Sequence, residues 1–258
     1  MTEEDIKNKL ETFFQSRDEI PLFYIESGSR LWNFASPDSD FDVRGFHLQL
    51  RERYFDFRRH RDIIEVMDGD FDLVSYDIDK MFGLLATSNP TVFEWIRAHI
   101  CYANILPDWK TLQKEIVDNY DFQALYYHYL SLAKVQLHDM EKGNKFTYKK
   151  VFYCIRGLLS SDLATQKIIP PLDVEQLLDL MDASNPLVEI ARNSLVQKRT
   201  GGEKLQVEAL NQQKVLSVIH PYMEELSARK SDKRSDNARL TNILTEYCIY
   251  LKTECYSQ

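Results

Sequence analysis

Short apolar runs in the first part of the chain predict a small β-sheet. Residues 20–26, IPLFYIE, are almost all apolar, as expected for a strand that is covered on both faces. Three later segments also have strand character, namely 41–49, 63–67 and 71–76. Asp68-Gly69 between the last two favours a hairpin turn. The first part of the chain is therefore expected to combine these strands with helices.

Apolar residues at intervals of three and four predict helices around and after these strands. In the first part of the chain the predicted helices cover 2–16, 29–35, 77–87 and 91–99. From about residue 107 the pattern is helical throughout, over 122–140, 147–166, 173–182, 187–197, 206–228 and 236–254. Pro221 predicts a break or kink in one of these helices, and 227–236 is expected to be a polar connection. We therefore expect an α+β fold with two domains, 1–106 and 107–258.

Composition limits the class of protein. The chain has 258 residues, 44% of them apolar, which is enough for a sizeable core. Its first residues, MTEEDIKNKLETFF, lack the basic start and apolar run of a signal peptide, and no apolar stretch is long enough to span a membrane. The four cysteines are scattered and the six histidines lack zinc-ligand spacing, so we expect reduced thiols, a cytoplasmic protein and no zinc site.

The net charge of −8 is concentrated in the first half of the chain. Residues 133–258 contain 18 Lys and Arg against 16 Asp and Glu, so the preceding half is strongly acidic and does not resemble a general nucleic-acid clamp. An exception is 51–62, RERYFDFRRHRD, with five arginines. This segment is either a binding site for a polyanion or triphosphate tail, or an exposed loop facing an acidic domain.

Three carboxylates are the strongest candidates for chemistry. Asp40 and Asp42 open a predicted strand and point to the same face, because side chains two apart in a strand share a face. Asp72 opens another predicted strand about thirty residues later. If the two strands are neighbours, the carboxylates can hold two Mg²⁺ ions for in-line displacement at the α-phosphorus of a nucleotide, with Asp72 as general base. Gly28 and Ser29, in the turn after the first strand, can offer hydrogen-bond donors to a phosphate.

The same residues resemble a known family. GSRLWNFASPDSDFDVRG is similar to the signature of the polymerase-beta nucleotidyltransferase superfamily. Later segments are similar to the predicted nucleotidyltransferases called the YcgL or RNA-repair-associated (RlaP-like) family: FDLVSYDIDKMFGLL, SNPTVFEW, YKKVFYCIRGLLSS, IIPPLD and LVQKRTGGEKL. The resemblance covers roughly residues 20–215.

The resemblance implies a mixed-sheet catalytic module followed by helices that frame the acceptor. It implies that Gly28 and Ser29 hold nucleotide phosphates and that Asp40, Asp42 and Asp72 bind Mg²⁺ or Mn²⁺. The expected reaction moves an NMP from an NTP, such as ATP, to an acceptor hydroxyl with release of pyrophosphate. An RNA 3′ end in RNA repair is the acceptor that the resemblance favours. The chain departs from the family at 31–33, Leu-Trp-Asn, where a small residue and Trp-Gly are usual; this bears on nucleotide preference.

Several cations and one tyrosine are secondary candidates for nucleotide binding. Arg30 either contacts a phosphate or pairs with the Asp-rich loop. Lys80 lies in the first turn of a predicted helix, where the dipole disfavours a cation, which hints at a phosphate partner. On a predicted helix, three residues share a face that either meets the triphosphate or base, or is surface with one core tyrosine: Lys149, Tyr153 and Arg156.

Two other classes of function stay open from the sequence. One is NMP transfer to a protein side chain or a small molecule, which suits the acidic surface. The other is a non-catalytic nucleotide-binding or antitoxin-like partner, although such a protein has no need of three gathered carboxylates. The sequence leaves open the NTP, the acceptor and the oligomeric state.

Overall fold

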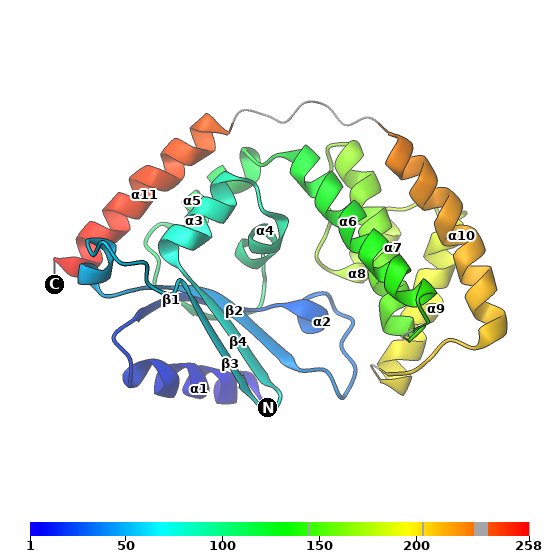
Figure 1. Cartoon of the computed structure of the whole chain (residues 1–258), viewed down its shortest axis with the longest axis horizontal. Helices are drawn as coiled ribbons and strands as arrows, with labels where there is room; N and C mark the ends of the chain where they lie inside the picture. Colours follow the sequence, from blue (N-terminus) through cyan, green and yellow to red (C-terminus); the bar gives the residue numbers. More distant parts are fainter. Residues whose placement is uncertain (144, 203, 230–236, 258) are drawn as a thin grey trace. The chain divides into compact units, whose positions relative to one another are not determined.

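The computed structural model describes residues 1–143, 145–202, 204–229 and 237–257. Five strands form one mixed sheet in the order β3-β4-β2-β1-β5 (Figure 1). They are β1 (Ile20–Glu26), β2 (Phe41–Leu48), β3 (Ile63–Asp68), β4 (Phe71–Asp77) and β5 (Cys101–Asn104). The pairing of β2 with β4 is parallel and the other three are antiparallel. The expected mixed sheet is confirmed, with β5 as an additional edge strand.

Helices cover both faces of this sheet (Figure 1). On one face, α1 (Glu3–Gln15) buries Ile6, Leu10 and Phe14 against side chains of β1, β2 and β4. A capping box between Thr2 and Asp5 fixes its start. On the other face lie α3 (Ile78–Ala86) and α5 (Trp109–Asp118), and α11 (Ala238–Tyr256) packs against both. In sequence between α3 and α5 lies α4 (Pro90–Ile96), whose N-cap is Asn89, the first residue of an Asn-Pro pair.

The remaining helices form a second compact unit. They are α6 (Phe122–Glu141), α7 (Tyr148–Thr165), α8 (Val174–Asp179), α9 (Pro186–Gly201) and α10 (Ala209–Ala228). Close packing of α6 on α7 depends on Gly157, because a Cβ there would lie 2.8 Å from the Tyr129 carbonyl oxygen. The predicted helical second half is therefore confirmed.

Contacts assign the chain to the two units in an interleaved way. Trp32–Ser39, which lies between β1 and β2 in sequence, belongs to the helical unit, whereas α5 and the C-terminal α11 belong to the sheet unit. The expected domains, 1–106 and 107–258, follow the sequence continuously, whereas the apolar faces of α5 and α11 are buried in the sheet unit. A change of composition along the chain cannot reveal that α11, which follows the helical unit in sequence, belongs to the sheet unit.

One helix prediction needs correction and another is narrowed. The helix expected over 29–35 is only α2 (Gly28–Leu31), because Asn33 has a φ of 58° and leaves the helical region. Of the break or kink expected at Pro221, a break is not found, because α10 continues through this residue, and a kink stays a prediction. The polar connection expected at 227–236 lies largely outside the described residues. Among the helices described, none combines the length and apolar character needed to cross a membrane.

Candidate active site

The first structural feature of the site is the turn between β1 and α2. Gly28 has a φ of +60°, and a Cβ at this position would lie 2.0 Å from Asp42 Oδ2. The backbone N–H of Ser27 donates to the Asp42 carbonyl oxygen at 2.8 Å. Only glycine therefore allows the turn to lie directly against the Asp42 carboxylate. The next residue, Ser29, is buried.

The second feature is a pair of carboxylates on neighbouring strands. The parallel register of β2 and β4 sets Asp42 opposite Asp72. Both side chains are about one-quarter exposed, at 29% and 25%. The adjacency that the sequence analysis required for these two aspartates is therefore present.

Arg44 occupies the space between these carboxylates. Its Nη2 donates to Asp42 Oδ1 at 2.8 Å and to Asp72 Oδ2 at 2.6 Å. Its Nη1 donates to the Asp72 carbonyl oxygen at 2.6 Å. Two neighbouring carboxylates repel each other, and the guanidinium of Arg44, hydrogen-bonded to both, offsets this repulsion.

Asp40 is not gathered with this pair into a three-carboxylate group. Its side chain is exposed, and its carbonyl oxygen accepts from Arg30 Nε at 3.1 Å. The Arg30 guanidinium lies 3.6 Å from the centre of the Phe41 ring. Within the described residues, no group of three or more His, Cys, Asp or Glu side chains is placed to hold a metal ion.

Sequence reasoning did not identify Glu26, at the end of β1. This carboxylate is 1% exposed, and its Oε1 accepts the backbone N–H of Asp42 at 2.9 Å. Tyr102 on β5 donates its hydroxyl to the other oxygen. Burial raises the pKa of Glu26 to about 7, although both hydrogen bonds act to lower it. The only sequence signal is an acidic residue closing an otherwise apolar strand.

Lys80 lies at the other end of β4 from Asp72. It is in the first turn of α3, where Nζ pairs with Asp62 Oδ2 at 3.0 Å and lies 5.6 Å from the centre of the Tyr76 ring. The strand between Asp72 and Asp77 spans roughly 16 Å at about 3.3 Å per residue. The structure therefore does not bring Lys80 to the carboxylate pair.

Two of the three candidates on α7 pack against aromatic rings of Trp32–Ser39. The Arg156 guanidinium is buried and lies 3.9 Å from the centre of the Trp32 ring. Tyr153 contacts the rings of Trp32 and Phe34 edge-on. The third candidate, Lys149, has its Nζ 6.0 Å from the Tyr153 ring centre. This face of α7 therefore carries a cation–aromatic cluster, in which Arg156 is buried and the other two residues are half-buried.

Lys198 on α9 is a second residue that sequence reasoning missed. It is completely buried, and its Nζ donates to the Phe34 carbonyl oxygen at 2.9 Å and to Ser39 Oγ at 3.1 Å. It also lies 4.3 Å from the centre of the Phe34 ring. A buried ammonium is expensive unless it is fully hydrogen-bonded, so Lys198 fixes the conformation of Trp32–Ser39. A lysine in a Lys-rich segment gives no sign of such burial.

Comparison with known proteins places the chain in a family. The sequence profile of RlaP, the RNA repair pathway DNA polymerase beta family, matches residues 2–246. An uncharacterized protein of Bacillus subtilis (strain 168), YcgL, is 31% identical over 248 residues, covering 91% of this chain and 93% of that protein. A crystal structure of a nucleotidyltransferase-like protein from Exiguobacterium sibiricum 255-15 aligns with 97% of this chain and 88% of its own, at 14% identity and a TM-score of 0.31. The chain belongs to the RNA repair pathway DNA polymerase beta family.

Proposed function

We propose that the protein is a metal-dependent nucleotidyltransferase that transfers an NMP from an NTP to the 3′ hydroxyl of an RNA, with release of pyrophosphate. The observation that carries the proposal is the parallel register of β2 and β4, which sets Asp42 beside Asp72 against the Gly28 turn. Membership of an RNA repair family supports RNA as the acceptor.

The donor set fits a hard divalent cation. Carboxylate oxygens are the ligands that Mg²⁺ and Mn²⁺ take, and Asp42 and Asp72 present them on adjacent rigid strands. Asp40, two residues before Asp42, lies outside this pair in the structure and stays a predicted ligand that follows from the family resemblance. Arg44 contacts the same oxygens, so cation binding requires its guanidinium to give way. One or two bound cations would neutralise the triphosphate and lower the pKa of the acceptor hydroxyl.

The protein groups have separate parts in the proposed transfer. The acceptor oxygen bonds to the α-phosphorus, the bond from that phosphorus to the bridging oxygen breaks, and pyrophosphate leaves. The Asp72 carboxylate accepts the proton of the hydroxyl. We assign Gly28, Ser29 and Arg30 to the nucleotide phosphates, because the turn that contains them lies against Asp42. Glu26 fixes the position of Asp42 by accepting a hydrogen bond from the Asp42 backbone N–H.

The other expected nucleotide ligands have less support. Lys149, Tyr153 and Arg156 stay predictions that follow from the family resemblance; the contacts described above join them to one another and to aromatic rings of Trp32–Ser39. The position of Lys80 at the far end of β4 does not favour a phosphate contact.

The test is label transfer from each α-labelled NTP with Mg²⁺ or Mn²⁺. Three acceptor pools are offered separately: RNAs with defined 3′ ends, cell protein, and cell metabolites. We expect label on RNA, and its loss in Asp42→Asn/Asp72→Asn, which keeps side-chain volume. The matched control is Asp118→Asn/Asp179→Asn, which neutralises two exposed carboxylates elsewhere and should leave transfer intact.

Other outcomes would redirect the proposal. Label on protein or on a metabolite would keep the chemistry and replace the acceptor. If the folded protein labelled nothing in a manner sensitive to Asp42 and Asp72, a non-catalytic nucleotide-binding or antitoxin-like role would replace the enzyme.

A further inference from the structure

Residues 51–61, RERYFDFRRHR, have no part in the site described above, and we call them the Arg/Phe segment. The segment follows β2 and starts with the 3-10 helix η1 (Arg51–Tyr54). Phe55 is 80% exposed and Phe57 is 96% exposed. Single exposed apolar residues are common on proteins, but two phenylalanines within three residues, interleaved with arginines, are a concentrated surface feature.

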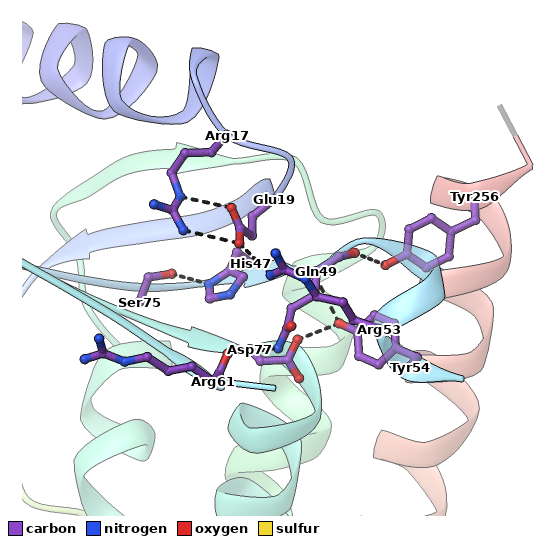
Figure 2. A network of polar contacts seen from close by, with 10 residues as sticks. All are labelled: Arg17, Glu19, His47, Gln49, Arg53, Tyr54, Arg61, Ser75, Asp77 and Tyr256. Atoms are coloured by element: carbon purple, nitrogen blue, oxygen red, sulfur yellow. Dashed lines mark hydrogen bonds and ion pairs between the residues drawn. The ribbon is translucent and has the colours of Figure 1, made fainter. Parts of the chain in front are cut away.

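The base of the Arg/Phe segment is fixed to the sheet unit by hydrogen bonds (Figure 2). The Tyr54 hydroxyl donates to Asp77 Oδ2 at 2.5 Å and accepts from the backbone N–H of Gln49 at 3.2 Å. Arg53 Nη1 donates to Glu19 Oε1 at 2.9 Å. These contacts order η1, so Phe55 and Phe57 are left in solvent beside an anchored turn.

Cavities lie on both sides of the anchored turn. One, of about 350 Å³, is lined by Arg17, Glu19, Arg53, His60 and Arg61 together with apolar residues of β3. Figure 2 shows Arg17 and Arg53 in contact with Glu19, whereas Arg61 extends away from it. The other cavity, of about 430 Å³, is lined by Arg51, Tyr54, Phe55, Lys252 and Tyr256, among others. The first cavity also contains Glu65, so three arginines stand against two carboxylates, and the second contains Asp79 beside its aromatic rings and two cations.

The charges of the segment are only partly compensated. Arg53, Arg58 and Arg61 pair with Glu19, Asp56 and Glu65, respectively. Arg51 and Arg59 are exposed, and neither forms an ion pair within the described residues. Two guanidinium groups are therefore available to an anion beside two exposed aromatic rings.

We propose that the Arg/Phe segment binds single-stranded RNA. Unstacked bases stack on exposed aromatic rings, and guanidinium groups bind the phosphates between them. A duplex offers phosphates but no free base faces, so the exposed phenylalanines favour a single strand. The choice of RNA over other single strands rests on the proposed function.

The location gives this RNA contact a distinct role. The Arg/Phe segment follows the C-terminal end of β2, whereas Asp42 lies at the start of that strand. The strand between them spans roughly 20 Å at about 3.3 Å per residue. The segment therefore holds the body of the acceptor, several nucleotides away from the end that reacts.

Fluorescence anisotropy with a labelled single-stranded RNA of about 20 nucleotides tests the proposal, in EDTA and without NTP, so that catalysis plays no part. We expect Phe55→Ala/Phe57→Ala to weaken binding about 5- to 100-fold. We expect Arg51→Gln/Arg59→Gln to reduce the slope of log affinity against log salt by about 1.4, at about 0.7 per phosphate contact. The matched controls, Leu210→Ala and Arg239→Gln, remove an exposed apolar residue and an exposed cation elsewhere and should bind like the wild type.

Several results would overturn the inference: no RNA binding by the wild type, equal binding by Phe55→Ala/Phe57→Ala, equal affinity for an RNA duplex, or binding to anionic vesicles but not to RNA. The label-transfer assay separates this failure from failure of the proposed function. RNA binding through the segment without transfer supports the inference and removes the proposed enzyme. Transfer to RNA, together with RNA binding that substitutions in the Arg/Phe segment leave unchanged, would support the proposed enzyme and overturn the inference.

Discussion

At the scale of single residues, the candidate site depends on close approach and on charge balance. Gly28 permits contact between a turn and a carboxylate, and Arg44 holds two carboxylates together. Neither effect is visible in a list of acidic residues. Each leads to a prediction about stability that can be measured without a substrate.

Gly28→Ala should destabilise the protein, because the added Cβ would meet Asp42 Oδ2 at 2.0 Å and the φ of +60° disfavours alanine. We expect a loss of about 3 kcal/mol in the free energy of unfolding. Gly83→Ala is the matched control, because Gly83 lies in α3 with nothing within 4 Å of an added Cβ. It should gain about 0.5–1 kcal/mol from helix propensity. Urea denaturation measures the free energy of unfolding of both variants. Equal changes in the two would contradict the close approach of Gly28 to the Asp42 carboxylate.

Arg44→Met should leave Asp42 and Asp72 facing each other without a counter-charge. We expect a loss of about 2 kcal/mol, since these groups are mostly buried. Mg²⁺ should restore more stability to this variant than it adds to the wild type, because it binds the same oxygens without displacing a guanidinium.

Thermal unfolding with and without Mg²⁺ measures this effect. Arg192→Met is the control, because Arg192 also bridges two carboxylates, Glu175 and Asp179, but on an exposed surface. Absence of any Mg²⁺-dependent recovery in Arg44→Met would argue against a cation site at Asp42 and Asp72.

At the scale of elements, a buried polar chain joins three strands at the far end of the sheet. His47 Nδ1 on β2 lies 2.8 Å from Ser75 Oγ on β4 (Figure 2). The same Ser75 Oγ lies 2.7 Å from the Tyr24 hydroxyl on β1. Burial lowers the pKa of His47 to about 4. Of the charged neighbours, Glu19 raises this pKa, and Arg17 and Arg53 lower it.

His47 should make stability fall in mild acid. Its pKa is lower in the folded protein than in the unfolded chain, so the unfolded chain binds more protons between about pH 6.5 and pH 4. Stability is fully present above this window and is lost as pH falls through it, by about 3 kcal/mol at its lower end. Burial shifts the pKa of Asp77 and of Glu26 upward, which opposes this loss as pH falls, so the wild type alone cannot isolate the histidine.

Urea denaturation at pH 7 and pH 5 compares the wild type with His47→Asn and with the exposed His99→Asn. We expect the change in the free energy of unfolding from pH 7 to pH 5 to be more favourable in His47→Asn than in the wild type, and the same as in the wild type for His99→Asn. The same pH dependence in all three proteins would show that His47 does not titrate in this way.

Long periodic segments were predictable from the sequence, whereas short or tertiary features were not. The helices and the strands β1 to β4 have clear patterns, but β5 is a four-residue edge strand, CYAN, too short to show alternation. The end of α2 depends on Asn33, whose carbonyl oxygen accepts from Arg199 far along the chain. Likewise Asp42 and Asp72 were recognisable by type and spacing, and Arg44, two residues after Asp42, could be interpreted as a partner of its carboxylate; the bridge from Arg44 to Asp72 and the buried support from Glu26 arise only from strand pairing.

At the scale of the whole molecule, the course of the chain through the two units matters for folding. Trp32–Ser39 belongs to the helical unit, although it lies in sequence between two elements of the sheet unit. The chain therefore enters the helical unit twice, and α11 returns to the sheet unit at the end. No single cut in the chain separates the units.

We therefore predict that residues 1–106 do not fold alone. Such a fragment lacks α5 and α11, whose Trp109 and Leu244 are buried in the intact chain, and it lacks Lys198, the buried partner of Phe34 and Ser39. The exposed apolar surface should give strong binding of a hydrophobic dye and no cooperative thermal transition. The full-length variant Leu244→Ala should fold but lose about 2–4 kcal/mol, because it creates a cavity between α11 and its neighbours. A cooperative melt of the 1–106 fragment would instead show that the sheet and its first helices are an autonomous domain.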